Sequence, residues 1–321
     1  MKLRINVLTL MFGLLGGLFS CSQEELADIP DNELKCDVSL VLSMGDIQTK
    51  AANDNYTYAT TEELTIENCH VAVFAVDVDG KPTDRIHYQN FSNSTEMGNF
   101  TNNIVDKLSG YKLTLNNVRT FGKSKKVRVL IVANADNTQF EQWTTYNQYV
   151  SGTIETSEFS DSKLVKVGLS EPTDLTYEST TESTEIPISL NQLTARIEYE
   201  GVFDDDNKKD DSISLISISG INKKSQVAIF DTEQVENTAY SLLNISGSNT
   251  FYTYETTTSE KKITLSVKKD SKTTEFPLDA TKFVKGNLYK IKGKYIPSVG
   301  FSINWEVTDM GRLSVTIPDF E

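Results

Sequence analysis

Residues 36–52 read CDVSLVLSMGDIQTKAA, a short apolar pattern followed by a basic residue. The apolar side chains recur at every second position, at Val38, Leu40, Leu42 and Met44. A period of two places such side chains on one face of a β-strand. The pattern therefore predicts a core strand near the start of the chain.

The residues after this predicted strand have little reason to pack. Lys50 and Ala51 lead into the polar run NDNYTYATTEE at 53–63. Exposed polar links of this kind are preferred sites of proteolysis. We hypothesise that a protease cuts between Lys50 and Ala51, and that a strand of another molecule then replaces residues 38–44.

The first 20 residues are expected to be a signal peptide rather than part of the fold. Basic residues precede an apolar run at 7–19, which is short for a transmembrane helix. Ser20 before Cys21 resembles a bacterial lipobox, and the acidic stretch 22–30 suits a solvated tether. The sequence predicts lipidation of Cys21 by a fatty acid such as palmitate. An ordinary secretory peptide with an incidental cysteine is the alternative.

Composition excludes some classes of function and leaves others open. The formal net charge of the 321-residue chain is -14, which argues against binding to nucleic acid. Besides Cys21, the chain has only Cys36 and Cys69, whose spacing fits no zinc pattern. We expect two small core-facing thiols. A disulfide between them is chemically allowed outside the cytoplasm.

Short segments with β-character recur along the rest of the chain. The segment 126–134 is nearly all apolar at its centre, which predicts a strand buried on both faces. Residues 89–108 are polar and expected to be loop, and a short helix is possible around 140–149. The segments with strand patterns are 70–77, 85–88, 111–115, 126–134, 186–190, 193–201, 212–220, 227–230, 251–254, 262–267, 288–295, 301–307 and 313–317.

Strands of this length and spacing predict an all-β fold with two tandem transthyretin-like or Greek-key β-sandwich domains. Residues 178–185 lack apolar side chains, and we expect the domain boundary there. The expected organisation is a signal peptide at 1–20, a tether and removable strand at 21–50, and sandwich domains at 51–184 and 185–321.

The last predicted strand repeats the pattern of the first. Leu313, Val315 and Ile317 alternate as Val38 and Leu40 do. A chain with a removable first strand and a similar terminal strand could donate the second to a neighbour, and head-to-tail contacts of this kind form open filaments. The alternative is that both are ordinary strands of one monomer.

Several stretches resemble the fimbrillin-type pilin subunits of Bacteroidales, which form type V pili. The resemblance covers nearly the whole chain. It depends on the lipobox with its acidic continuation and on residues 49–81, 127–137, 193–199 and 220–230.

The resemblance implies a structural subunit of a surface fimbria that mediates adhesion and has no enzymatic activity or cofactor. Such subunits are exported as lipoproteins to the outer membrane and cut by a trypsin-like protease. They then polymerise with other pilin subunits by strand exchange into an extracellular fimbria. Cys21 would be the lipid site, Lys50–Ala51 the cut, residues 38–44 the leaving strand, and Leu313, Val315 and Ile317 the donors. The family often has arginine before the cut, so Lys50 could also mark an uncut terminator or anchor.

The sequence patterns that could indicate a metal site or a catalytic site are weak. The acidic run 204–211 lacks the glycine and closing glutamate of a calcium loop and is expected to be a solvated loop. Adjacent Cys69 and His70 should point to opposite faces of a strand, which disfavours a catalytic pair. The alternative function is a surface lipoprotein that binds glycans for a sugar-uptake system, with Trp143, Tyr146 and Tyr149 stacking on sugars.

Overall fold

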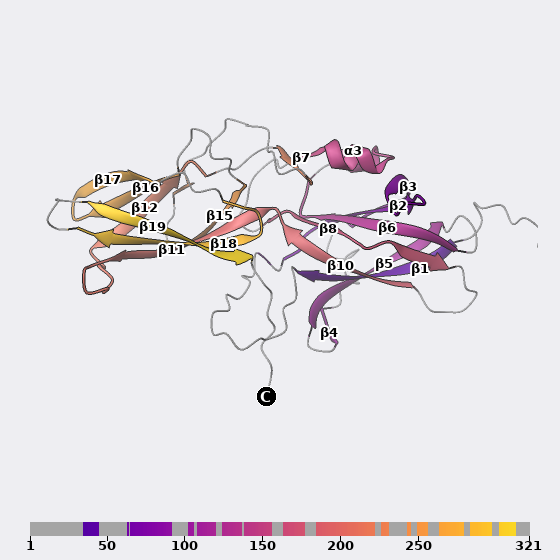
Figure 1. Cartoon of the computed structure of the whole chain (residues 1–321), viewed down its shortest axis with the longest axis horizontal. Helices are drawn as coiled ribbons and strands as arrows, with labels where there is room; N and C mark the ends of the chain where they lie inside the picture. Colours follow the sequence, from indigo (N-terminus) through magenta and orange to yellow (C-terminus); the bar gives the residue numbers. More distant parts are fainter. Residues whose placement is uncertain are drawn as a thin grey trace, which may run out of the picture.

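The computed structural model confirms the all-β class and shows two β-sandwiches arranged end to end (Figure 1). The residues that the structure describes are 35–44, 63, 65–91, 102–105, 108–119, 124–136, 138–155, 163–176, 184–221, 226–230, 243–244, 249–255, 263–278, 283–296 and 302–312.

Nine strands form the first sheet, in the order β3-β2-β6-β8-β10-β1-β5-β4, with β9 beside β6. They are β1 (Lys35–Met44), β2 (Cys69–Val76), β3 (Pro82–Phe91), β4 (Asn102–Val105), β5 (Leu108–Arg119), β6 (Ser124–Ala133), β8 (Lys166–Leu169), β9 (Thr173–Thr176) and β10 (Thr184–Gln192).

Strand β10 lets this sheet fold over on itself. Its first residues pair with β1, whereas Asn191 and Gln192 pair with β8. The β1-β5 side and the β2-β6 side therefore form two layers that enclose one core. Leu40 and Leu113 from one layer belong to the same buried cluster as Val71 and Val129 from the other.

Strand β6 is buried on both faces, as its apolar centre predicted. Val129 and Ile131 face the first core, and Leu130 and Val132 belong to a second cluster. That second cluster is covered by η2 (Thr138–Glu141) and α3 (Tyr146–Ser151), which agree with the possible helix around 140–149.

The second sandwich consists of two four-stranded sheets, β15-β11-β18-β19 and β14-β12-β16-β17. A small separate sheet pairs β7 with β13, and Ile154 of β7 belongs to the second cluster together with Leu130 of β6. The strands are β7 (Thr153–Glu155), β11 (Thr194–Phe203), β12 (Ile213–Ser219), β13 (Gln226–Ala228), β14 (Leu243–Asn244), β15 (Thr250–Tyr254), β16 (Thr264–Lys269), β17 (Lys272–Pro277), β18 (Asn287–Tyr295) and β19 (Ile303–Arg312).

One local expectation needs correction, and the strand pairing favours another position for the domain boundary. Residues 102–105 form strand β4 against β5, although they belong to the stretch 89–108 that was expected to be loop; the strand is four residues long and is defined by its pairing with β5. Strand β10 lies in the first sheet, and its Ile186, Ile188 and Leu190 belong to the first core. The second core begins at Ala195. We therefore propose a domain boundary near residue 193 instead of 184/185.

Gly168 on β8 should be intolerant of any side chain. A Cβ there would lie 2.7 Å from Ile188 Cγ2 and 2.7 Å from the backbone oxygen of Ser189. We expect Gly168→Ala to lower the free energy of unfolding by about 1–3 kcal/mol through overpacking. Urea denaturation measures this, with Val78→Ala at a fully exposed turn position as the control. Equal stability of the two variants would contradict the close packing of β8 on β10.

Candidate functional site

The first strand occupies an interior place in the sheet, between β10 and β5 (Figure 1). It runs parallel to β10, with Leu40 beside Ile186, and antiparallel to β5, with Leu40 beside Leu113. Both edges of its backbone are therefore hydrogen-bonded, as for any strand inside a sheet. Strand β1 therefore supplies backbone hydrogen-bond partners to β10 and to β5 at the same time.

The inward face of β1 is fully desolvated. Val38, Leu40 and Leu42 are each at most 1% exposed and belong to the core of the first sandwich. Fully burying one such side chain contributes roughly 1.5–3 kcal/mol. The alternation in the sequence correctly predicted this face. Met44 is the last residue of β1.

The outward face of β1 is crossed by an ion pair. Lys112 of β5 stands in the row of Val41, and Glu185 of β10 stands in the row of Ser39. Lys112 Nζ lies 2.6 Å from Glu185 Oε1, so the pair passes diagonally over β1 between those rows. We call the Lys112–Glu185 ion pair the crossing pair. Ser39 is only 1% exposed, whereas Val41 is 36% exposed.

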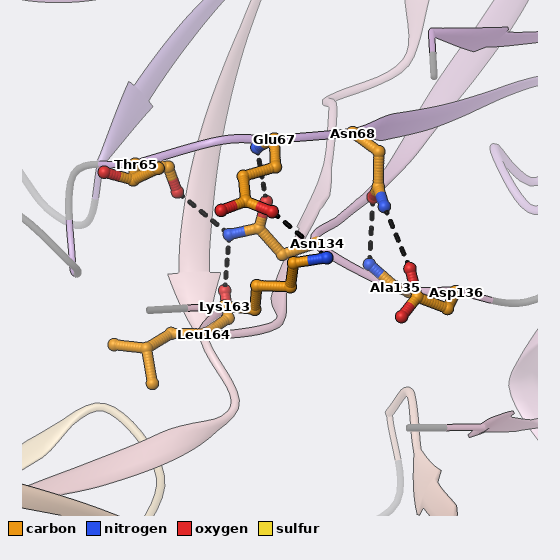
Figure 2. Close-up of polar contacts among 8 residues, drawn as sticks. All are labelled: Thr65, Glu67, Asn68, Asn134, Ala135, Asp136, Lys163 and Leu164. Carbon is orange, nitrogen blue, oxygen red and sulfur yellow. Dashed lines mark hydrogen bonds and ion pairs between the residues drawn. The ribbon is translucent and has the colours of Figure 1, made fainter. Parts of the chain in front are cut away.

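The chain just before β2 is held by the amide of Asn134, which follows β6 (Figure 2). Asn134 Oδ1 accepts a hydrogen bond from the backbone N–H of Glu67 at 2.7 Å. Its Nδ2 donates to the carbonyl oxygens of Thr65 at 2.9 Å and Leu164 at 3.0 Å. Asn134 has a φ of 60°, a left-handed conformation that asparagine tolerates better than most residues. One side chain thus joins three segments.

Neighbouring side chains strengthen this junction. Asn68 Oδ1 accepts from the N–H of Ala135 at 3.0 Å, and Lys163 forms an ion pair with Glu67 at 3.1 Å (Figure 2). Lys166 Nζ donates to the carbonyl of Thr65 at 2.9 Å. Burial lowers the pKa of Lys166 to about 8, an effect that the charge of Glu63 opposes.

A buried ion pair connects the same segment to the second sandwich. Arg196 Nη1 on β11 lies 3.1 Å from Glu63 Oε2, and the two side chains are 8% and 5% exposed. Arg196 Nη2 also contacts Glu198. Glu63 and residues 65–68 are therefore fixed by contacts that do not involve β1, although they lie downstream of the predicted cut in the sequence.

Some predicted site residues lie outside the described residues: Cys21, Lys50, Ala51, Leu313, Val315 and Ile317. Their roles stay predictions. The structure does bring the predicted leaving strand into the first core. Sequence reasoning missed Asn134, Arg196 and Glu63, because their contacts join residues far apart in the chain.

Comparisons with known proteins identify the family. The model of the Fim1F C-terminal domain matches residues 193–309. A Parabacteroides distasonis protein described as a fimbrium tip subunit, Fim1F, is 44% identical over 332 residues and covers 100% of both chains. The chain belongs to the Fim1F family of fimbrial proteins.

Solved structures agree with this Fim1F-family assignment. A crystal structure of a fimbrial assembly protein from Parabacteroides distasonis has 41% identity and a TM-score of 0.67, covering 86% of this chain and 99% of that one. The tip fimbrial protein Mfa3 from Porphyromonas gingivalis has 11% identity and a TM-score of 0.51, covering 85% of this chain and 99% of that one, and it shows the fold alone.

The aromatic residues considered for sugar binding pack in or against the second cluster of this Fim1F-family chain: Tyr149 is buried, and Trp143 and Tyr146 are partly buried. Tyr149 is 1% exposed, and its ring lies 5.7 Å from Phe140 and 5.0 Å from Trp143. Tyr146 packs edge-on against Phe74 at 5.4 Å. These rings cover the outer face of β2 and β6, so they serve the core and do not favour the glycan-binding alternative.

The remaining polar candidates are structural in the part of the chain that the structure describes. His70 contacts Tyr88 Oη and the Ala135 carbonyl, each at 2.9 Å, while Cys69 faces the first core, as their opposite directions predicted. Cys36 and Cys69 are free, and burial raises the pKa of both thiols. No metal-binding cluster and no helix able to cross a membrane occurs among the described residues.

The buried face of β1 predicts a clear difference between two neighbouring positions. Leu40→Ala should lower the free energy of unfolding of the uncut chain by about 2–5 kcal/mol, because it leaves a cavity in the core. Val41→Ala, on the outward face, should change it by less than about 0.5 kcal/mol. Chemical denaturation measures both, and similar losses at the two positions would mean that β1 is not packed as described.

Lys166 predicts a pH dependence of stability. Its pKa is lowered from 10.5 to about 8 in the folded chain. Between those values the unfolded chain holds a proton that the folded chain lacks, so stability rises with pH. Relative to Lys166→Met, the wild-type free energy of unfolding should therefore increase from pH 8 to 10.5. Denaturation under reducing conditions at several pH values tests this, and parallel profiles for the two proteins would disprove it.

Proposed function

We propose that this chain is a non-enzymatic subunit of a cell-surface fimbria, placed at or near the tip, and joined to its neighbour by strand exchange at the site of β1. The main observation is that an interior strand with a fully buried face precedes a segment anchored independently of it. The relationship to a protein described as a fimbrium tip subunit supports the position at the tip.

Removal of β1 would leave a site that only another strand could fill well. The backbone edges of β10 and β5 would lose their partners, and the core would open along the positions of Val38, Leu40 and Leu42. A new strand would restore the hydrogen bonds through its backbone and fill the core through alternate side chains. Exchange therefore exploits the same interactions that stabilise the uncut sandwich.

The anchored segment supports a cut before residue 63. Glu63 pairs with Arg196, and Thr65 is bonded to Asn134 and Lys166. These contacts would keep the new end of the chain attached after a cut at Lys50–Ala51. Detachment of β1 would then open one site without loosening the start of β2.

Export and localisation complete the proposal. Residues 1–20 would direct export, and Cys21 would hold the precursor at the outer membrane through its lipid. A trypsin-like protease that accepts lysine would cut after Lys50. The product would leave the lipid anchor and join other subunits in an extracellular fimbria that mediates adhesion.

Brief trypsin treatment of the purified precursor tests this order of events. We expect a main product that begins at Ala51, because the strands on either side are folded and slow to be cut. The cut fragment that ends at Lys50 should stay bound to this product without a covalent link. Incubation with partner subunits should release the fragment and form oligomers that heating dissociates. Intact mass measurement and unheated electrophoresis detect these steps.

Lys50→Gln is the matched control, because it removes the cut while leaving β1 unchanged. This variant should stay full-length and monomeric. The proposal is wrong if trypsin cuts elsewhere first, or if the cut chain keeps its first strand in the presence of partner subunits.

A further inference from the structure

On the outward face of β1, the side chain of Ser39 has much less free space around it than the side chain of Val41. The crossing pair lies over the stretch between Ser39 and Val41, yet Ser39 is almost fully covered and Val41 is partly exposed. Because the crossing pair belongs to β5 and β10, it would remain when β1 leaves. Any strand that takes the place of β1 would meet the same restriction.

We propose that the crossing pair acts as a size filter on the replacing strand. The partner is an extended segment of a neighbouring fimbrial subunit with aliphatic side chains at three alternate positions and a small residue between the first two. Between the second and the third aliphatic residue lies an outward position, that of Val41, which accepts larger side chains. This inference rests on the proposed function and adds to it the selection of the partner strand.

The chemistry at Ser39 favours small size rather than a polar group. Ser39 Oγ is buried and has no hydrogen-bond partner among the described residues. A buried hydroxyl without a partner is unfavourable, so alanine should suit the position at least as well as serine. A large side chain would have to displace Lys112 or Glu185, whose side chains are joined at 2.6 Å.

The end of this chain has a segment of the required pattern. Residues 313–317 read LSVTI, which aligns with VSLVL at 38–42. Ser314 then takes the place of Ser39, and Thr316 takes the place of Val41. In this alignment the segment runs in the direction of β1, parallel to β10 and antiparallel to β5. A peptide that copies residues 311–319 is therefore a suitable probe of the size filter.

The first experiment uses the uncut chain and does not depend on strand exchange. Ser39→Phe should destabilise the protein clearly more than Val41→Phe, and Ser39→Ala should leave stability unchanged or raise it. In a Lys112→Ala/Glu185→Ala background, most of the difference between the two phenylalanine variants should disappear. A difference that persists in this background would show that the crossing pair is not the restriction.

The second experiment uses the trypsin-cut chain, and native mass spectrometry follows displacement of the strand by peptides. The Ser314→Trp peptide should displace the strand at least about tenfold less effectively than the Thr316→Trp peptide, because only the former clashes with the crossing pair. The Lys112→Ala/Glu185→Ala protein should accept both peptides within about threefold of each other.

The outcomes separate the two proposals. If no peptide displaces the first strand, the proposed exchange fails and the size filter fails with it. If both substituted peptides displace it equally well from the unaltered protein, exchange stands and the size filter is wrong. Greater sensitivity at Thr316 than at Ser314 would overturn the proposed alignment and with it the size filter as stated.

Discussion

The structure depends on the pairing of β1 with strands on both of its edges. An edge strand can leave a sheet at the loss of one row of hydrogen bonds, whereas β1 serves β10 and β5 together. Its three inward side chains also belong to the core. An empty site would expose unpaired backbone and apolar surface at once, which is a strong template for another strand. An empty site is therefore unfavourable, and we expect the place of β1 in this Fim1F-family chain to be occupied either by β1 itself or by another strand.

A separate set of contacts limits how far a change at β1 can spread. Asn134 joins the segment before β2 to the end of β6 and to Leu164, and Arg196 joins Glu63 to the second sandwich. A buried ion pair is weak support for stability because its charges lose their hydration. Breaking the Arg196–Glu63 pair would nevertheless be costly, because it would leave one buried charge without its partner. In the proposed exchange, these contacts would keep the start of β2 in place when β1 leaves.

The sequence predicted those features that depend on local pattern. Alternation at Val38, Leu40 and Leu42 correctly predicted a core strand, and the apolar centre of β6 predicted burial on both faces. Long-range pairing was not predictable in this way. Strand β4 has only four residues, too few to show a pattern, and is defined by its pairing with β5. Strand β10 belongs to the first sandwich because it pairs with β1. Arg196 and Glu63 are separated by 133 positions, so no local pattern shows that they meet.

The two faces of β1 differ in what they contribute to recognition. In the proposed exchange, the inward side chains and the backbone of the replacing strand would supply most of the binding free energy, and many alternating apolar strands would meet these two requirements equally. The crossing pair is exposed at its two ends, by 39% and 59%, and such a pair contributes little to stability. Its effect on partner choice does not require a large attraction, because a clash with the wrong side chain is enough to discriminate. A weak interaction across the outer face can thus select among strands that the core alone would accept.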